Sequence, residues 1–392
     1  MTTPDLQTIV VGAGALGSAT AYWLAERGQS DVVVLEQYDL GHAQGASVDH
    51  HRAIRHSYHD NKYGRLTRAA FANWDRLAAE SGVPVLVRTG GLEIGLEGSA
   101  GADMIRKYRK VLDDNGHPYE AWSNAELTER YPQWSVPEPA AVTFQPEMGF
   151  VDIGKAGQTH RALASANGVT FRGHSAAVKL ESVPGAVRVH LASGESLTAE
   201  HVVACTGAWS DSLLADVGQN WTTTVSQEQV AYVVPKNLRE FAPERFPVWG
   251  WYGPQLLYGF PVYGEVAIKL ARDMSGRFVT PQTRSFDPVP EETALLLEFL
   301  RERLPDAAGY ELMSKTCIYD MPPDRDFVID FAPAERRVVI ANGAGHAGKF
   351  AGLFGEILSE LVVAGRSWFP IEPFRADRPS LTDPAFVPVF AL

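Results

Sequence analysis

The amino-acid sequence predicts an α/β protein with two connected domains, and two observations support this fold class. Residues 7–35 contain two short apolar segments on either side of a helical segment, which is the pattern of a βαβ unit with a parallel sheet. A chain of 392 residues is also longer than one small hydrophobic core usually supports. We therefore expect a parallel-sheet domain that begins near residue 7 and a second domain connected to it.

The first βαβ unit is predicted element by element. Residues 7–11 are expected to form a short buried strand, and residues 12–17 a tight glycine turn. Residues 19–27 are expected to form a helix that Gly28 closes, and residues 32–35 a second apolar strand. The two strands then lie side by side and parallel, with the helix as their crossover.

Three glycines of the turn, Gly12, Gly14 and Gly17, have the spacing G-x-G-x-x-G directly after a strand and before a helix. The first permits the turn, the second lets the backbone approach a pyrophosphate, and the third allows close helix-strand packing. Glu36 ends the second strand, where a carboxylate can accept hydrogen bonds from an adenosine ribose. The motif predicts a Rossmann-type dinucleotide-binding domain. Glu36 disfavours NADP, but the motif does not distinguish FAD from NAD.

Later segments add elements to this domain. Residues 63–77 carry apolar side chains at helical spacing, which predicts an amphipathic helix. Residues 187–191 alternate between apolar and polar side chains and have turn residues before and after them, which predicts an antiparallel hairpin. Residues 201–206 and 337–341 are apolar and predict buried strands. After the second of these, a glycine turn is followed by a predicted helix over residues 350–363.

A different composition marks the second domain. Between about residues 222 and 314, aromatic side chains cluster at 249–263 and a helix is predicted over 291–303. We assign this stretch to substrate binding, so the cofactor domain is discontinuous in sequence. The predicted ranges are 1–85, 142–215 and 317–392 for the cofactor-binding domain, and 86–141 and 216–316 for the substrate domain.

Composition narrows the class of partner. The formal net charge of -12 disfavours nucleic acid, because such proteins usually concentrate Lys and Arg into a basic face. The two cysteines, Cys205 and Cys317, provide neither a disulfide framework nor a cysteine-based metal site, and we expect no metal. No apolar stretch reaches the roughly 18 residues of a membrane span, and a strand that starts near residue 7 leaves no room for an export signal. We expect a cytoplasmic protein with a small-molecule ligand.

Six segments stand out in order along the chain: RAIRH at 52–56, VACTGAW at 203–209, YGFP at 258–261, IKL at 268–270, KTCIY at 315–319 and GAGHAGKF at 343–350. Together they resemble the monomeric sarcosine oxidase and N-methyltryptophan oxidase family of D-amino-acid-oxidase-like flavoenzymes, and the similarity covers essentially the whole chain. The resemblance implies FAD as cofactor on a discontinuous Rossmann-type domain. It also implies an α+β substrate domain built on a mixed, mostly antiparallel sheet.

The resemblance assigns roles to several residues. It implies that Cys317 carries FAD through a thioether, and a thiolate is a competent nucleophile toward an electrophilic ring position. It places Lys269 beside the flavin, where a fixed cation stabilises the charge that develops as O2 is reduced. It implies that Arg52 covers one face of the flavin and that Arg55, with Lys349, pairs with the substrate carboxylate. A planar guanidinium suits that role because its donors match a carboxylate in a bidentate way.

The turn over residues 343–348 precedes a helix, so its N–H groups and the positive helix end are expected to stabilise negative charge on the reduced flavin. His346 lies in this turn, where it is either structural or hydrogen-bonded near the flavin. Tyr258 and Tyr319 are expected to line the pocket or to belong to the core. The expected catalytic residues are Lys269, Arg52, His346 and Tyr258, and the expected substrate-binding residues are Arg55, Lys349 and Tyr319. The expected cofactor-binding residues are Gly12, Gly14, Gly17, Glu36, Ser47, Arg52, Gly207, Trp209, Cys317, Gly343, Gly345, Gly348 and Lys349.

The implied reaction oxidises the C–N bond of a small secondary amino acid, such as sarcosine, to an imine that hydrolyses, while O2 is reduced to H2O2 by a monomeric enzyme. Asp273 departs from the family, because sarcosine oxidases carry a pocket histidine four residues after the lysine. This departure leaves the substrate open between an N-methyl amino acid, a cyclic imino acid such as pipecolate or proline, and a glycated amino acid. Two other classes also remain open: a flavin dehydrogenase with another electron acceptor, and a non-catalytic NAD-binding protein.

Overall fold

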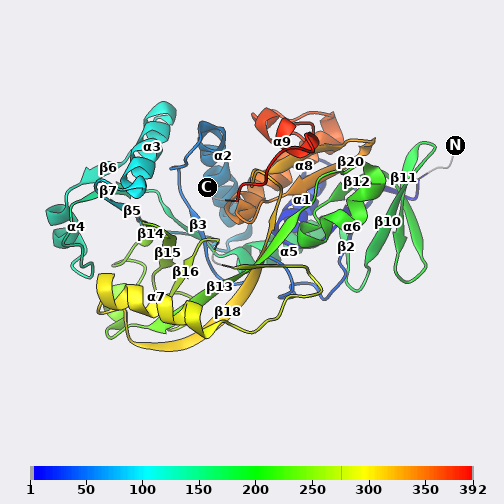
Figure 1. The fold of residues 1–392 in the computed structure, drawn as a ribbon. Coiled ribbons are helices and arrows are strands. Elements are labelled where there is room, and N and C mark those ends of the chain that lie inside the picture. Colours follow the sequence, from blue (N-terminus) through cyan, green and yellow to red (C-terminus); the bar gives the residue numbers. More distant parts are fainter. Residues whose placement is uncertain (1–3, 275, 391–392) are drawn as a thin grey trace.

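The computed structural model describes residues 4–274 and 276–390 (Figure 1). Its strands form three sheets, of eight, nine and three strands. In Figure 1 the eight-stranded sheet occupies the right side, with the hairpin of β10 and β11 at its edge, and the nine-stranded sheet with α7 lies at the lower left. This mixed α/β architecture confirms the predicted fold class.

The eight-stranded sheet contains the predicted βαβ unit. Strand β1 (Leu6–Val11) pairs in parallel with β2 (Val32–Leu35) on one side and with β12 (Ser196–Ala204) on the other. The crossover helix α1 (Ala15–Glu26) packs against α8 (Ala351–Ala364), so segments from both halves of the chain cover the sheet. Helix α5 (Ile153–Ala166) also packs on α1, and β9 (Thr170–Arg172) adds a parallel strand beside β2.

The remaining strands of this sheet are the hairpin of β10 and β11 and the pair of β19 and β20. Strands β10 (Ala177–Val183) and β11 (Ala186–Leu191) form the predicted hairpin, which continues into β12. Strand β20 (Glu335–Asn342) pairs in parallel with β12 and antiparallel with β19 (Val328–Ala332).

Two predicted boundaries in this sheet were wrong. The glycine turn is shorter than residues 12–17, because α1 already begins at Ala15 and Gly17 lies inside it. The predicted strand over 201–206 ends at Ala204, so Cys205 and Thr206 follow the strand and lead into a 3-10 turn, Gly207–Trp209. Apolar composition alone did not show where backbone pairing stops.

The nine-stranded sheet has the strand order β17-β13-β16-β15-β14-β5-β7-β6, with β18 paired to β13. Every pairing in it is antiparallel except that of β14 with β5, which is parallel. The strands are β5 (Gly91–Leu96), β6 (Glu120–Trp122), β7 (Ala140–Gln145), β13 (Thr224–Val234), β14 (Val248–Tyr252), β15 (Leu256–Phe260), β16 (Ile268–Arg272), β17 (Arg277–Val279) and β18 (Tyr310–Met321).

Helices cover this sheet and the space between the two large sheets. Helix α7 (Pro290–Arg303) starts with a proline in its first turn, where the missing N–H costs no hydrogen bond. Helix α3 (Ala100–Asn115) and the short α4 (Asn124–Arg130) both begin with serine caps. Trp249 and Trp251 of β14 are buried in the hydrophobic core below α7, so much of the aromatic cluster is core.

A small third sheet of β3 (Arg52–Ile54), β8 (Gly149–Val151) and β4 (Leu86–Arg88) lies under the long helix α2 (Asn61–Ser81). The short helices α6 (Ser210–Leu214) and α9 (Pro379–Thr382) complete the fold. None of the helices within the described ranges is long and apolar enough to cross a membrane. The boundaries of the two domains stay a prediction.

Candidate active site

A cavity of about 1200 Å³ collects most of the residues that the sequence singled out. It exceeds the roughly 300–1,000 Å³ of pockets for drug-sized ligands, as a site for a dinucleotide and a small substrate must. Gly17 is the one predicted cofactor residue outside its lining, because it is packed against the Gly12 carbonyl group and Val10. The lining contains the predicted residues Gly12, Gly14, Glu36, Ser47, Arg52, Arg55, Gly207, Trp209, Tyr258, Lys269, Cys317, Tyr319, Gly343, Gly345, His346, Gly348 and Lys349.

The glycine motif forms one end of this cavity. Gly12 has a φ of 99°, and a Cβ on it would lie 2.4 Å from the carbonyl oxygen of Cys205. A Cβ on Gly17 would lie 1.8 Å from the carbonyl oxygen of Gly12, so α1 packs directly on the turn. Neither position accepts a side chain without moving backbone, which is the physical reason for both glycines.

Glu36 is tied to the glycine turn. Its carboxylate accepts hydrogen bonds from the N–H groups of Ala13, at 2.9 Å, and Tyr38, at 3.1 Å. His42 lies 3.2 Å away and had not been predicted from the sequence. Although burial alone would raise it, the hydrogen bonds from His42 and Ala13 hold the pKa of Glu36 below its ordinary value.

A partly buried cation beside the turn was also missed. Arg161 of α5 lines the cavity, and its guanidinium lies 3.4 Å from both the carbonyl oxygen of Ala13 and the Ser18 hydroxyl. Burial lowers the pKa of Arg161, and Glu36 opposes this shift. A guanidinium next to a helix N-terminus suits a pyrophosphate. Only the fold brings residue 161 to this turn, since its own sequence context carries no motif.

The cavity has further features that fit FAD. At the end with Lys269 and Cys317, the Thr316 hydroxyl and both ring nitrogens of His51 are buried and have no hydrogen-bond partner among the described residues. Both side chains belong to residues that line the cavity. Buried polar atoms normally have partners, so these atoms are positioned to meet polar groups of a bound molecule.

Lys269 of β16 is almost completely buried, with 3% of its side chain exposed. Its Nζ lies 2.6 Å from the Asp49 carboxylate, which also accepts a hydrogen bond from the Tyr232 hydroxyl. Burial lowers the pKa of Lys269, and the charge of Asp49 opposes that shift. Asp49 has a φ of 77°, a conformation that non-glycine residues rarely adopt. The sequence did not indicate Asp49 as the partner of this lysine.

Cys317 lies on β18, opposite Glu228 of β13. Burial raises the pKa of its thiol, whereas the positive charges of Arg52 and Lys269 lower it. Arg52 is fixed by the loop before β3, where its guanidinium donates to the carbonyl oxygens of His51, at 2.7 Å, and Ala46, at 2.5 Å. The two cations are therefore the groups that favour the thiolate in this part of the cavity.

Arg55 is enclosed by protein groups. Its Nη1 lies 3.1 Å from the fully buried Glu93 carboxylate and donates to the Tyr252 hydroxyl at 2.5 Å. The guanidinium also lies over the ring of Tyr108, at 5.1 Å, and near that of Tyr58, at 5.5 Å. A substrate carboxylate at Arg55 would thus meet a cation whose charge is already partly balanced by Glu93.

Lys349 supplies the second cation. Burial lowers its pKa to about 7, and the positive charge of Arg55 adds to the effect. Its ammonium lies 5.6 Å from the centre of the Tyr58 ring, and its carbonyl oxygen accepts a hydrogen bond from Trp74 at 2.7 Å. The backbone of Lys349 is thereby anchored to α2 while its side chain lines the cavity.

The glycine turn before α8 lies beside a buried carboxylate. The N–H groups of Gly343 and Gly345 lower the pKa of Asp320, but burial outweighs them and raises it to about 7. The role of this turn in stabilising charge on a flavin stays a prediction. Gly345 is required for another reason, because a Cβ there would lie 2.6 Å from the ring of Tyr319.

His346 is held by the neighbouring loop. Its Nε2 lies 3.1 Å from the carbonyl oxygen of Arg325, and its ring packs against Phe327. Burial and the positive charge of Lys349 keep the pKa of His346 well below its ordinary value, so the ring is neutral at pH 7. Tyr258 and Tyr319 both line the cavity.

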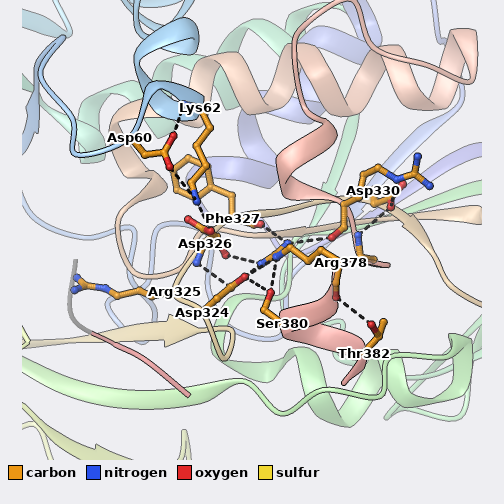
Figure 2. A network of polar contacts seen from close by, with 12 residues as sticks. Asp60, Lys62, Asp324, Arg325, Asp326, Phe327, Asp330, Arg378, Ser380 and Thr382 are labelled. Carbon is orange, nitrogen blue, oxygen red and sulfur yellow. Dashed lines mark hydrogen bonds and ion pairs between the residues drawn. The ribbon is translucent and has the colours of Figure 1, made fainter. Parts of the chain in front are cut away.

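Asp273, the residue that departs from the family pattern, also lines the cavity. Both of its carboxylate oxygens accept hydrogen bonds from Nη2 of Arg325, at 3.0 and 2.9 Å. Arg325 had no predicted role. It is 1% exposed, and its position in the loop after β18 is visible in Figure 2.

One His-His-Glu group lies outside the cavity. The Nε2 of His56 lies 3.2 Å from Glu147, and its ring stacks on His117 with centroids 3.7 Å apart and an interplanar angle of 12°. Nearly parallel stacked rings direct their lone pairs side by side rather than toward one point. The group therefore has a structural explanation without a metal ion.

Comparisons with known proteins agree with this geometry. The profile of a family described as FAD dependent oxidoreductase (DAO) matches residues 7–361. Monomeric sarcosine oxidase of Bacillus sp. strain B-0618 is 29% identical over 380 residues, which cover 96% of each chain. N-methyl-L-tryptophan oxidase of Yersinia pestis strain Pestoides F is 28% identical over 359 residues, which cover 90% of this chain and 94% of that protein.

Solved structures show the same fold. NikD, described as an unusual amino acid oxidase essential for nikkomycin biosynthesis, matches with a TM-score of 0.84 at 24% identity, over 95% of this chain and 98% of that chain. L-proline dehydrogenase from P. horikoshii matches with a TM-score of 0.83 at 20% identity, over 95% of this chain and 97% of that chain.

Proposed function

This chain belongs to the DAO family of FAD-dependent oxidoreductases, and on this premise we propose that it oxidises the C–N bond of a small secondary amino acid with O2 as electron acceptor. The amine loses two electrons and two protons to become an imine, and water converts the imine to an aldehyde and a primary amino acid. O2 takes up the two electrons and two protons to give H2O2. FAD, when bound, supplies the two-electron chemistry that connects these halves.

One observation carries this proposal most directly: two glycines of the motif, Gly12 and Gly14, line the same cavity as Lys269 and the cation pair of Arg55 and Lys349. The cation pair suits the carboxylate of an amino acid rather than a simple amine. The two curated relatives described above are named for sarcosine and N-methyl-L-tryptophan, and both compounds carry a secondary amine next to a carboxylate.

The chain's own residues would divide the work as follows. Gly12, Gly14 and Arg161 would hold the pyrophosphate, and Glu36 the adenosine ribose. Arg52 would cover one face of the flavin. The cation at Lys269 would stabilise the negative charge that develops as O2 is reduced.

The substrate end would need fewer groups. Arg55 and Lys349 would orient the substrate through its carboxylate, and Tyr258, Tyr319 and neutral His346 would exclude water around the amine. We assign no side chain as an essential base, because a secondary amine can lose its proton on binding.

We also propose a thioether between Cys317 and FAD, in which the new S–C bond would replace the S–H bond of Cys317 and one C–H bond of FAD, with the two electrons and two protons passing to O2 to give H2O2. The support is the position of Cys317 on the cavity wall next to two cations that favour its thiolate. Cys205 provides a matched control, since it also lines the cavity but lies beside the glycine turn, where burial alone raises the pKa of its thiol.

The first experiment denatures purified protein in acid and asks whether the yellow chromophore stays with the precipitate. Wild type and Cys205→Ala should retain the colour, and Cys317→Ala should release it to the supernatant. Colour released from wild type would refute the thioether, and the absence of flavin from protein refolded with FAD would refute the cofactor.

The reaction itself is tested by substrate-dependent peroxide release. The panel contains sarcosine, N-methyl-L-tryptophan, pipecolate, L-proline and a fructosyl amino acid. Peroxide from at least one secondary amino acid supports an oxidase, and the profile identifies the substrate. Flavin reduction by a substrate without peroxide formation in air would instead assign a dehydrogenase. Size-exclusion chromatography of the purified protein tests the expected monomer. Fractionation of cells that produce the protein tests the expected cytoplasmic location.

A further inference from the structure

We propose that Arg325 is a positioning residue of the substrate pocket, which neutralises Asp273 and fixes its carboxylate in the cavity wall. The inference rests on the proposed function, because it concerns how that pocket receives an anionic substrate. It goes further by assigning a role to a residue that touches no substrate and to the segment over residues 375–390.

Arg325 is held in place by its backbone N–H and carbonyl groups and by the two terminal nitrogens of its guanidinium. Its N–H donates to the carbonyl oxygen of Pro322 at 2.9 Å, and its own carbonyl oxygen lies 3.1 Å from Nε2 of His346. Its guanidinium lies over the ring of Tyr319, at 5.8 Å, and binds both oxygens of Asp273. One buried residue therefore contacts three residues of the cavity wall, namely Asp273, Tyr319 and His346.

The loop that carries Arg325 is fixed from the opposite side. Figure 2 shows Arg378 directed at the Asp324 carboxylate, which it binds with two hydrogen bonds of 2.7 and 2.8 Å. The Ser380 hydroxyl donates to the same carboxylate. In addition, Nη1 of Arg325 donates to the carbonyl oxygen of Phe390 at 2.9 Å. The segment over residues 375–390 thus holds both the loop and the guanidinium.

These contacts hold the Arg325 side chain in one fixed orientation. Arg325 has a φ of 54°, which is unfavourable for an arginine, and it is 1% exposed. A side chain that served only to cover the surface would need neither the backbone strain nor the burial of a charge. The contact of Nη2 with both oxygens of Asp273, 14% of whose side chain is exposed, is the ion pair through which Arg325 reaches the cavity wall.

The electrostatic consequence concerns the substrate carboxylate. Asp273 raises the pKa of Lys349 and Arg325 lowers it, so the two charges oppose each other in their effect on this cation. If Arg325 lost its charge, Asp273 would become an unbalanced anion in the pocket. It would repel a substrate carboxylate and keep Lys349 protonated to higher pH.

The test measures binding of furan-2-carboxylate, a carboxylate with no amine to oxidise, by calorimetry between pH 6 and 9. Flavin-loaded wild type is compared with Arg325→Met, Asp273→Asn and the double variant. We expect Arg325→Met to bind about tenfold more weakly. The double variant should recover to within about threefold of wild type, because it removes both charges.

The pH profile provides a readout that mere loss of packing would not move. The pH at which carboxylate binding weakens should be higher in Arg325→Met than in wild type. In the double variant this pH should return to the wild-type value. Arg303→Met is the matched control, since Arg303 is also buried and paired with a carboxylate, Glu138, but does not line the cavity. It should leave carboxylate binding unchanged. If Arg325→Met does not fold, Arg325→Lys is measured in its place. Because it keeps the charge, it should bind furan-2-carboxylate more weakly than wild type but by less than about tenfold.

Each result has a separate meaning. A double variant that binds as weakly as Arg325→Met, or an Arg325→Met variant that binds like wild type, would overturn the role of Arg325. Wild type that binds the carboxylate but oxidises no secondary amine would instead overturn the proposed function and leave this inference standing.

Discussion

The Arg55–Glu93 contact allows the sharpest test of the electrostatics in this pocket. Glu93 is fully buried, and its carboxylate lies 3.1 Å from Nη1 of Arg55. It also accepts hydrogen bonds from Ser57, at 2.6 Å, and Gln145, at 3.0 Å. Burial raises the pKa of Glu93, while Arg55 and these donors lower it. With so many donors aimed at it, we expect the carboxylate to be ionised at pH 7.

Replacing Glu93 by glutamine keeps the shape and removes the charge. Arg55 would remain buried without its counter-ion, and the new amide would direct N–H groups toward groups that are themselves donors. Removing one partner of a buried ion pair costs about 3–5 kcal/mol, so we expect the free energy of unfolding to fall by that amount. The same change should tighten the binding of a carboxylate, because Arg55 would then act with its full charge.

The assay is urea unfolding at pH 7 followed by tryptophan fluorescence, together with calorimetric binding of furan-2-carboxylate. Glu97→Gln is the control, because the Glu97–Arg106 pair, at 3.2 Å, is about half exposed. Its loss should change the free energy of unfolding by less than about 1 kcal/mol. If Glu93→Gln also cost less than about 1 kcal/mol, Glu93 would be protonated in the folded protein and the reasoning would be refuted.

Three further predictions follow from individual residues. Gly17→Ala should abolish FAD binding, since its Cβ would lie 1.8 Å from the carbonyl oxygen of Gly12; normal flavin absorbance in the variant would contradict this. The pKa of Lys349 is about 7 in the folded protein, so its charge is present below pH 7 and is lost above it. The dissociation constant of a carboxylate should therefore rise up to about tenfold per pH unit above pH 7, and Lys349→Met should bind weakly at every pH. Burial lowers the pKa of His160 to about 3, so the stability that its neutral ring contributes is present above pH 6.5 and is lost as pH falls. At pH 5 this loss is about 2 kcal/mol, and His160→Phe should flatten the acid limb of a plot of stability against pH.

Local sequence patterns predicted much of the fold. The first βαβ unit, the hairpin over 187–191 and the helices over 291–303 and 350–363 all formed, with ends that differ by a few residues. These elements were predictable because apolar periodicity and glycine spacing are local properties of the chain. The most specific residues, Cys317, Lys269 and Lys349, lay in short motifs that resemble a known family, and the fold brings them to one cavity.

Partners of these residues were not predictable in the same way. Glu93 lies 38 positions after Arg55, and Asp49 lies 220 positions before Lys269, so nothing local connects them. The turn over 343–348 shows the same limit. Its N–H groups are the correct type for binding an anion, but the sequence did not indicate that the buried Asp320 carboxylate lies beside Gly343 and Gly345. Sequence patterns indicated the chemical type of a residue, whereas the tertiary contacts decided which group it serves.

The position of β20 in the first sheet has a consequence for synthesis of the protein. Strand β12 pairs with β1 on one side, while on the other side its residues 196–199 pair with β11 and its residues 202–204 pair with β20, and α8 covers α1. A growing chain exposes the glycine turn and β12 well before β20 exists. At roughly 5–20 residues per second, the interval is on the order of ten seconds. During this time residues 202–204 of β12 and one face of α1 stay uncovered, so the nucleotide-binding half must wait for residues 335–364 before it can close.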